Sequence, residues 1–317
     1  LACIKNNKNF LITTHINLEG DALSSELAFF RILKAMGKHA IIINADNTPL
    51  EYDFLPGINN IRKFNNNLRN IKFDCFVVLD CSDLSRCGRV SSLNIEHRPV
   101  LNIDHHISNK RFADINWVEP GSSSCTQMIY KLCKELRIPL NKEIAMLLYV
   151  GILTDTGSFR YPNTNSLTHK IVSQLLEHNL NIVQIYNKVY ENIAFKDMKL
   201  LVQILPALKC QLNGKVTYLT ITRQLLKKYR GISFDLTEYA LNFARAIKDV
   251  EVVVLFKEDP EQKNEVRVNL RSQGEVDVNK IASFFGGGGH KTASGCTIKG
   301  IIEEVRRRVL AKIRESL

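Results

Sequence analysis

Short apolar runs separated by a helix-like segment constrain the fold of this chain more than any other feature. Four runs have the length and composition of buried strands: Phe10–Thr14, Ala40–Asn44, Cys75–Leu79 and Pro99–Ile103. Between the first two, apolar residues recur at helical spacing from Ala22 to Met36, and Gly37 stands where a helix would end. Alternating strands and helices favour a doubly wound α/β domain, with a mostly parallel sheet and helices on both faces.

The second half of the chain has a different pattern, which predicts a second domain. Further helices are expected at 122–136, 141–153, 166–178, 223–229, 237–247, 278–285 and 301–315. Further strands are expected at Lys215–Ile221, Val250–Lys257 and Glu265–Leu270, the last two antiparallel across a polar turn. Residues 181–205 look like a helical connector closed by Pro206. We therefore expect a larger domain at 1–185, a helical linker at 186–205 and a smaller α/β domain at 206–317, with a cleft between the two domains.

Composition narrows the class of protein. A chain of 317 residues with 45% hydrophobic and 8% aromatic residues is neither disordered nor fibrous. Its net charge of +11 favours polyanionic partners such as nucleotides or nucleic acid. It has no apolar run of the roughly 18–20 residues that a membrane span needs. Its eight cysteines form no Cys-x-x-Cys pair, so we expect reduced thiols, no zinc site and a cytoplasmic protein.

Candidate metal ligands follow the expected strands. His15, Glu19 and Asp21 come after the first strand, Asp80 ends the third, Asp104-His105-His106 follows the fourth, and Asp155 lies in an apolar segment. The carboxyl ends of parallel strands meet at one sheet edge, so these side chains should converge there. Each acid taken alone has an ordinary alternative, such as a helix cap or a turn. Together they favour two hard divalent ions, because carboxylates and imidazoles suit Mn²⁺, Mg²⁺ or Fe²⁺.

A glycine run forms a second constellation. Gly286-Gly287-Gly288-Gly289 is followed by His290 and Lys291. Successive glycines expose backbone N–H groups that can cradle a phosphate, and the two basic side chains add donors. The alternative is a flexible turn between a helix and a strand. Arg271 and Ser272 end the preceding strand, and the Arg271 guanidinium is suited to a phosphate or a base.

These motifs together resemble the DHH/DHHA1 phosphoesterases. The resemblance covers essentially the whole chain and rests on Thr14–Leu23, Val77–Asp80, Asn102–His106, Gly151–Phe159, Asn269–Ser272 and the Gly286–Gly295 segment. The branch that the chain is most similar to contains the nanoRNases and pAp phosphatases, together with enzymes that cut linear or cyclic di-adenylate. The larger domain would then be the DHH catalytic domain and the smaller one the DHHA1 substrate-binding domain.

The resemblance implies roles for the matching residues. His15 and Glu19 would hold one Mn²⁺, Asp21, His105 and Asp155 would hold the other, and Asp80 would bridge them. Asp104 and His106 would orient the ligands and contact the scissile phosphate. The DHHA1 residues expected to bind substrate are Arg271, Ser272, Gly287, Gly288, Gly289 and His290. The family usually has Pro-Asp where this chain has Leu18-Glu19, so a longer carboxylate must reach the first metal.

The expected activity is that of a Mn²⁺-dependent phosphodiesterase and phosphatase that acts on very short nucleotides such as nanoRNA, pApA, pAp or cyclic di-AMP. Two alternatives stay open. One is a RecJ-like single-strand exonuclease, although no additional domain of that kind is visible. The other is a metal-impaired nucleotide-binding protein, suggested by Glu19. A pyrophosphatase is disfavoured by the Gly286–His290 segment, and the resemblance implies a homodimer.

Overall fold

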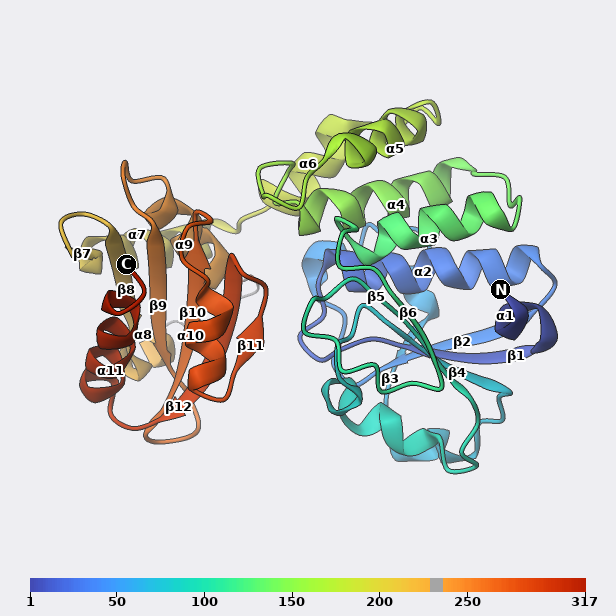
Figure 1. Cartoon of the computed structure of the whole chain (residues 1–317), viewed down its shortest axis with the longest axis horizontal. Coiled ribbons are helices and arrows are strands. Elements are labelled where there is room, and N and C mark those ends of the chain that lie inside the picture. Colours follow the sequence, from blue (N-terminus) through green and yellow to red (C-terminus); the bar gives the residue numbers. More distant parts are fainter. Residues whose placement is uncertain (229–235) are drawn as a thin grey trace. The chain divides into compact units, whose positions relative to one another are not determined.

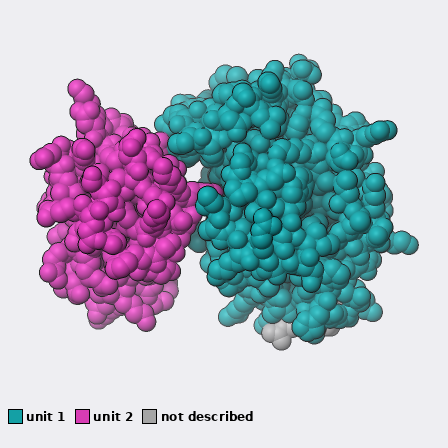
Figure 2. Space-filling view, viewed as in Figure 1, with its two compact units in different colours: residues 1–192 teal, residues 193–317 magenta. Residues whose placement is uncertain are grey.

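The computed structural model describes residues 1–228 and 236–317, which divide into two compact units, Leu1–Asn192 and Ile193–Leu317 (Figures 1 and 2). The segment predicted as a linker, 186–205, belongs partly to each unit. Helix α6 (Ile182–Tyr190) ends in the first unit, and α7 (Phe195–Ile204) lies in the second. Within the described residues, no helix is long and apolar enough to cross a membrane.

The first unit is built on a six-stranded parallel sheet with the order β3-β2-β1-β4-β5-β6. Its strands are β1 (Asn9–Thr13), β2 (His39–Asn44), β3 (Ile61–Lys63), β4 (Cys75–Leu79), β5 (Val100–Asp104) and β6 (Ile115–Val118). The chain adds β2 and β3 on one side of β1 and then returns to add β4 on the other. The carboxyl ends of β1 and β4 therefore flank the point where the direction of winding reverses, which is where open α/β sheets bind ligands.

Helices cover both faces of this sheet, which confirms the predicted fold class. One face carries α2 (Gly20–Ala35), α3 (Cys125–Glu135) and α4 (Lys142–Asp155), which Figure 1 shows as one layer. Helices α5 (Ser166–Leu176) and α6 extend this layer, and α1 (Ala2–Asn6) precedes β1. The main apolar core lies between this layer and the sheet.

The opposite face of the sheet is covered by short 3₁₀ helices. They are η1 (Leu50–Tyr52), η2 (Ile58–Asn60), η3 (Asn66–Asn70) and η4 (Leu84–Leu93). Side chains from β1 and β4, among them Leu11 and Phe76, pack there against Cys87 and Val90 of η4. The segment after Asp80 is therefore held by its own small core.

The second unit is a mixed six-stranded sheet with the order β11-β12-β10-β9-β8-β7. Its strands are β7 (Lys209–Gln211), β8 (Val216–Ile221), β9 (Val252–Glu258), β10 (Glu265–Ser272), β11 (Gly288–Gly289) and β12 (Ala293–Lys299). The β8–β9 pair is parallel, and the other pairs, including the predicted β9–β10 pair, are antiparallel.

Helices flank both faces of this second sheet. They are α7, η5 (Leu205–Ala207), α8 (Arg223–Lys228), α9 (Leu236–Arg245), α10 (Val278–Phe284) and α11 (Ile302–Arg314). Helices α10 and α11 pack on one face, and α7 and α9 pack on the other. The helix predicted at 223–229 is α8, and its expected last position, 229, lies outside the described residues.

Candidate metal centre

The site is built at the carboxyl ends of β1, β4 and β5, as the sequence predicts. Thr14, directly after β1, donates a hydrogen bond from its hydroxyl to the Leu79 carbonyl oxygen at 2.8 Å, which ties the ends of β1 and β4 together. Asp80 follows with φ 51°, a left-handed conformation that is uncommon for residues with a side chain but is adopted more readily by Asp and Asn than by others. This turn directs the chain sharply away from the strand and places the Asp80 carboxylate at the sheet edge.

The Asp80 carboxylate is the centre of the cluster. It is 1% exposed, and neither oxygen has a hydrogen-bond partner among the described residues. The His105 Nε2 atom lies 3.4 Å from Asp80 Oδ1, and the His15 Nε2 atom lies 3.7 Å from Oδ2. Leaving a buried carboxylate without hydrogen bonds is costly unless a cation neutralises it. The two unsatisfied oxygens therefore fit a position shared by two divalent ions.

The neighbouring side chains form suitable donor sets around Asp80, with His15 at Oδ2 and both His105 and His106 at Oδ1. The sets are His15 with Glu19, Asp21 with His105, and Asp104 with His106, and each set's ligand atoms lie within 4.8 Å of one another and of an Asp80 oxygen. Asp155 joins the second set, because its Oδ2 atom lies 3.4 Å from His105 Nε2. All six predicted metal ligands and both further catalytic candidates are thus brought together. Oxygen and imidazole donors without thiolate are the set that hard divalent ions prefer.

Electrostatics within the cluster couple metal binding to proton release. Burial raises the pKa of Asp80, but the imidazoles of His105 and His15 hold it well below its ordinary value. Burial lowers the pKa of both histidines, yet the surrounding carboxylates raise them well above the usual value. The raised histidine pKa values favour imidazoles that carry protons beside the carboxylates, and a metal ion held by these residues would replace those protons.

Asp21 is anchored by the start of a different helix from its own. Its carboxylate accepts hydrogen bonds from the backbone N–H groups of Cys125 at 2.6 Å and Thr126 at 3.0 Å, and from the Thr126 hydroxyl at 2.7 Å. Asp21 lies in the first turn of α2, but it satisfies the N-terminus of α3. Burial and the charge of Asp80 raise its pKa to about 7.

Two glycines allow α2 and α4 to approach closely enough to form the site. A Cβ atom at Gly151 would lie 2.4 Å from the Thr126 side chain and 2.6 Å from Asp21 Oδ1. A Cβ atom at Gly20 would lie 2.5 Å from the Thr154 side chain. Gly151 therefore leaves the space that the Asp21 carboxylate occupies, four residues before Asp155 on the same helix.

Hydrogen bonds from the opposite ring nitrogens orient the histidines. His15 Nδ1 lies 2.7 Å from the Ile16 carbonyl oxygen, and His105 Nδ1 lies 3.2 Å from the Ser122 carbonyl oxygen. In both rings Nδ1 is the donor to the carbonyl, which leaves Nε2 facing the carboxylates as an acceptor for metal. His106 Nδ1 lies 2.7 Å from Asp104 Oδ1, so Asp104 holds the His106 ring.

Glu19 lies within reach of the first donor set. Its Oε1 atom is 3.7 Å from His15 Nε2, and its side chain is 54% exposed. It precedes α2 as the N-cap residue, yet its side chain makes no capping hydrogen bond. The ordinary alternative for Glu19, a solvated side chain, is compatible with this exposure, so Glu19 stays a candidate ligand on the basis of its distance to His15.

The structure adds supporting residues that the sequence did not reveal. The Asn109 amide nitrogen donates to Asp104 Oδ2 at 2.5 Å, and the Asn163 amide nitrogen donates to the Asp155 carbonyl oxygen at 3.1 Å. Glu26 is fully buried on α2, and its Oε2 atom accepts a hydrogen bond from Asn44 at 2.7 Å. Burial raises the pKa of Glu26 to about 8. The position of this acidic residue among the apolar residues of α2 is the sequence feature from which its burial could have been predicted.

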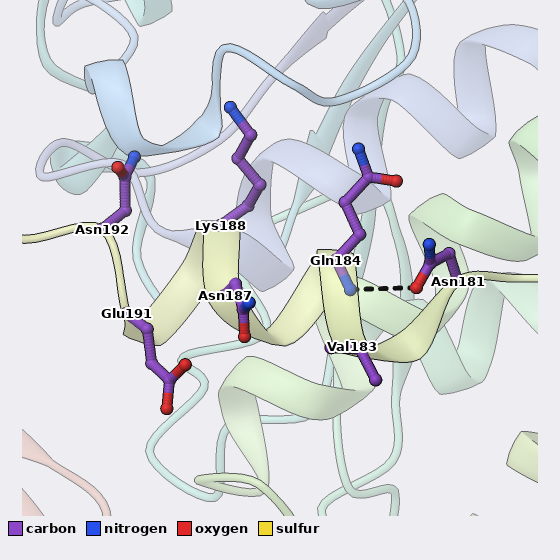
Figure 3. A pocket seen from close by; sticks show the side chains of 7 residues that line it. All are labelled: Asn181, Val183, Gln184, Asn187, Lys188, Glu191 and Asn192. Carbon is purple, nitrogen blue, oxygen red and sulfur yellow. Dashed lines mark hydrogen bonds between the residues drawn. The ribbon is translucent and has the colours of Figure 1, made fainter.

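A surface hollow along α6 is separate from this cluster. Figure 3 shows that its lining consists mainly of amide and charged side chains from α6 and from the residues directly before and after it. The lining residues are Asn181, Val183, Gln184, Asn187, Lys188, Glu191 and Asn192. None is a candidate ligand, and the hollow has no set of acids and histidines comparable to the one around Asp80.

Comparison with known proteins places this geometry in a family. The DHH family N-terminal domain matches residues 9–152, and the DHHA1 domain matches residues 213–317. A Thermus thermophilus protein is 31% identical over 311 residues, which cover 96% of this chain and 89% of that protein. The chain belongs to the DHH/DHHA1 family. It is thus a phosphoesterase, a hydrolase, as the sequence motifs predict.

Other relatives of this DHH/DHHA1 protein cover most of its length. A Bacillus subtilis protein is 27% identical and covers 91% of this chain and 88% of its own. It and the Thermus thermophilus protein are both named bifunctional oligoribonuclease and PAP phosphatase NrnA. The crystal structure of an exopolyphosphatase-related protein from Bacteroides fragilis superposes with a TM-score of 0.87 at 27% identity, covering 98% of this chain and 93% of that one.

In the DHHA1 domain, two of the three polar side chains predicted to bind substrate, those of Arg271 and Ser272, have partners within the unit. Arg271, 15% exposed, donates from Nη2 to the Glu238 carboxylate on α9 and from Nη1 to the Leu270 carbonyl oxygen at 3.0 Å. The Ser272 hydroxyl is buried and donates to Glu251 at 3.0 Å. Glu251 also accepts the backbone N–H groups at 275 and 276, so Ser272 belongs to the network that holds this loop.

Local structure accounts for some of the four glycines in the run Gly286–Gly289. The N–H groups of Gly286 and Gly287 donate to carbonyl oxygens at the end of α10. A Cβ atom at Gly287 would lie 2.2 Å from the Gly295 carbonyl oxygen, and Gly289 has φ 144° beside β12. Helix capping and close packing on β12 therefore explain three of the four glycines. A Cβ atom at Gly288 would meet Asn279 Oδ1 at 3.9 Å, an ordinary contact, and the His290 backbone N–H donates to the Ala293 carbonyl oxygen at 2.7 Å.

Proposed function

We propose that this protein is a Mn²⁺-dependent two-metal phosphodiesterase and phosphatase that hydrolyses very short nucleotides to mononucleotides. The observation that supports this most strongly is the Asp80 carboxylate, buried without hydrogen bonds among the donor sets around it. One ion would be held by His15, Glu19 and Asp80. The other would be held by Asp80 together with Asp21, His105 and Asp155.

Two such ions would supply a hydroxide nucleophile at neutral pH and neutralise charge that develops on the phosphate. The chain's own residues position that chemistry. Asp104 fixes the His106 ring through Nδ1, and we propose that His106 contacts the scissile phosphate. Asn109 holds Asp104 in turn. Removal of any member of this chain of contacts should lower turnover more than it lowers substrate affinity.

The substrate class is proposed from the relatives and from charge. Two relatives are named as oligoribonucleases that are also PAP phosphatases, and a net charge of +11 suits a polyanionic substrate. We propose pApA, pAp and nanoRNA as the main substrates, with cyclic di-AMP as a further candidate. The DHHA1 residues proposed to bind the substrate end that is not cleaved are Arg271, Ser272, Gly287, Gly288, Gly289 and His290. The enzyme is proposed to act as a homodimer in the cytoplasm.

Turnover assays distinguish this proposal from its alternatives. The purified chain with Mn²⁺ should hydrolyse pApA and pAp faster than a 24-mer or pyrophosphate. A RecJ-like exonuclease would prefer the 24-mer. A metal-impaired binding protein would bind pApA without hydrolysing it, and its Glu19 would make no difference to metal binding.

An Asp80→Ala variant tests the bridging carboxylate directly. It should lower kcat by several orders of magnitude, because both ions lose a shared ligand. Asp53→Ala, which removes an exposed carboxylate of the same unit, is the matched control and should keep parental activity. Circular dichroism checks that both variants fold. Full turnover by folded Asp80→Ala protein would refute the two-metal proposal.

A further inference from the structure

The Arg271–Glu238 ion pair lies on the face of the second sheet that α9 covers. Arg271 is opposite Val253 of β9 and Ala293 of β12 in the strand register, and Val253 packs in the core beneath α7 and α9. Glu238 lies in the first turn of α9, where a helix favours acidic side chains. Arg271 and Glu238 are 33 positions apart in the sequence, so the pair is a tertiary contact formed by the fold of this unit.

The Glu238 carboxylate binds the same Arg271 guanidinium that a substrate phosphate would bind. A guanidinium binds carboxylate and phosphate oxygens with the same N–H groups, so the two anions compete for Arg271. The Glu238 side chain is 38% exposed, and an ion pair that water reaches contributes little stability. An incoming anion of higher charge can therefore replace the carboxylate at small cost.

The charge of the incoming group decides how well it competes. A terminal phosphate monoester carries about −1.5 to −2 charges at pH 7, as a phosphorylated side chain does. A carboxylate carries one negative charge, and a terminal ribose hydroxyl carries none. The monoester can thus displace Glu238 from Arg271, whereas the hydroxyl leaves the pair closed.

We propose that Glu238 is a built-in competitor on Arg271 that a terminal phosphate monoester of the substrate must displace, so that Glu238 sets the affinity for substrates carrying this group. This inference rests on the proposed function of Arg271 in holding the uncleaved end of the substrate. It assigns Glu238 no part in the chemistry of the metal centre.

The test uses the full-length Mn²⁺-loaded protein and the Glu238→Gln variant with pApA and ApA, which differ only in the terminal phosphate. Loss of the competitor should lower KM for pApA by about two- to fivefold, the factor expected of a partly exposed ion pair. KM for ApA and kcat for both substrates should stay within twofold of the parent. Glu303→Gln, which removes an exposed acid on α11, controls for the change in net charge and should alter neither substrate.

Dependence on Arg271 is tested by a double-mutant cycle. In an Arg271→Ala background, Glu238→Gln should no longer change KM for pApA. Without Arg271 there is no guanidinium for which Glu238 and the substrate phosphate could compete. The inference is overturned if Glu238→Gln leaves KM for pApA unchanged or raises it, if pApA and ApA change equally, or if the gain persists without Arg271. A raised KM would mean that Glu238 orients Arg271 for the substrate.

Failure of the proposed function can be distinguished from failure of this inference. If the parent protein hydrolyses neither dinucleotide, the proposed function fails. Calorimetric binding of AMP and adenosine to the same variants then tests Glu238 alone. Glu238→Gln should tighten AMP binding by about two- to fivefold and leave adenosine unchanged. Equal effects on the two ligands, or none, would overturn the inference.

Discussion

Replacing Gly151 by alanine should damage the metal centre through packing, without altering any ligand. The new Cβ atom would lie 2.4 Å from the Thr126 side chain and 2.6 Å from Asp21 Oδ1, far inside contact distance. In an ordinary helix interior the same change stabilises by about 1 kcal/mol. Here overpacking should cost about 1–3 kcal/mol, and disruption of the hydrogen bonds to buried Asp21 should cost about 1.5–3 kcal/mol.

These opposing effects leave a net destabilisation of roughly 1.5–5 kcal/mol. For a unit of this size, the melting temperature should fall by about 3–20 °C. Because the displaced carboxylate is a proposed ligand, Mn²⁺ affinity should also fall by at least about tenfold. Thermal unfolding in chelator and Mn²⁺ titration by calorimetry measure the two effects separately.

Gly121→Ala is the matched control, because a Cβ atom there has no neighbour within 4 Å. It should change neither the melting temperature nor the metal affinity. If Gly151→Ala is as stable as the parent and binds Mn²⁺ equally well, the close packing of α4 against Asp21 does not determine the position of that carboxylate. The geometric account of the second donor set would then be wrong.

Three further predictions concern the acids of the first unit. Glu19→Ala should weaken metal binding and turnover, while Glu19→Asp should retain or improve both, as measured by calorimetry and pApA hydrolysis; no change in Glu19→Ala would make Glu19 a bystander. The pKa of Asp21 is raised to about 7, so below pH 7 a metal ion must displace the proton on the Asp21 carboxyl group. Mn²⁺ affinity should therefore fall by about tenfold per pH unit below 7 for each proton displaced. A pH-independent affinity between pH 6 and 8 would contradict this. The pKa of Glu26 is raised to about 8, so folded protein keeps a proton that the unfolded chain loses above about pH 4.5, and stability falls as pH rises between these values. Glu26→Gln should therefore gain stability relative to the parent by up to about 3–4 kcal/mol between pH 5 and 8 in denaturant unfolding, and a parallel pH dependence would refute the assignment.

The strands that build the site could be predicted because they are buried on both faces and read as continuous apolar runs. The edge strands β3 and β6 were not predicted. Ile61-Arg62-Lys63 is short and partly exposed, and Ile115–Val118 has no fully buried residue. Their backbone pairing with a neighbouring strand determines their conformation, and composition alone does not reveal it.

The candidate ligands could be predicted from topology, since parallel strands bring their carboxyl ends to one edge. The residues that hold them in place could not. Asn163 reaches the Ser123 carbonyl oxygen across 40 positions of sequence, and Asp21 meets the N-terminus of α3 across 104. The glycine run was ambiguous for a different reason, because capping, close packing and phosphate binding all favour glycine.

Counting the metal ions tests the central proposal most directly. Chelator-treated protein should be titrated with Mn²⁺ by calorimetry while pApA hydrolysis is followed on the same samples. We predict two ions per chain, activity that appears only as the second ion binds, and loss of both properties in Asp80→Ala. A single ion per chain with full activity, or hydrolysis by metal-free protein, would contradict a centre in which Asp80 is shared by two metals.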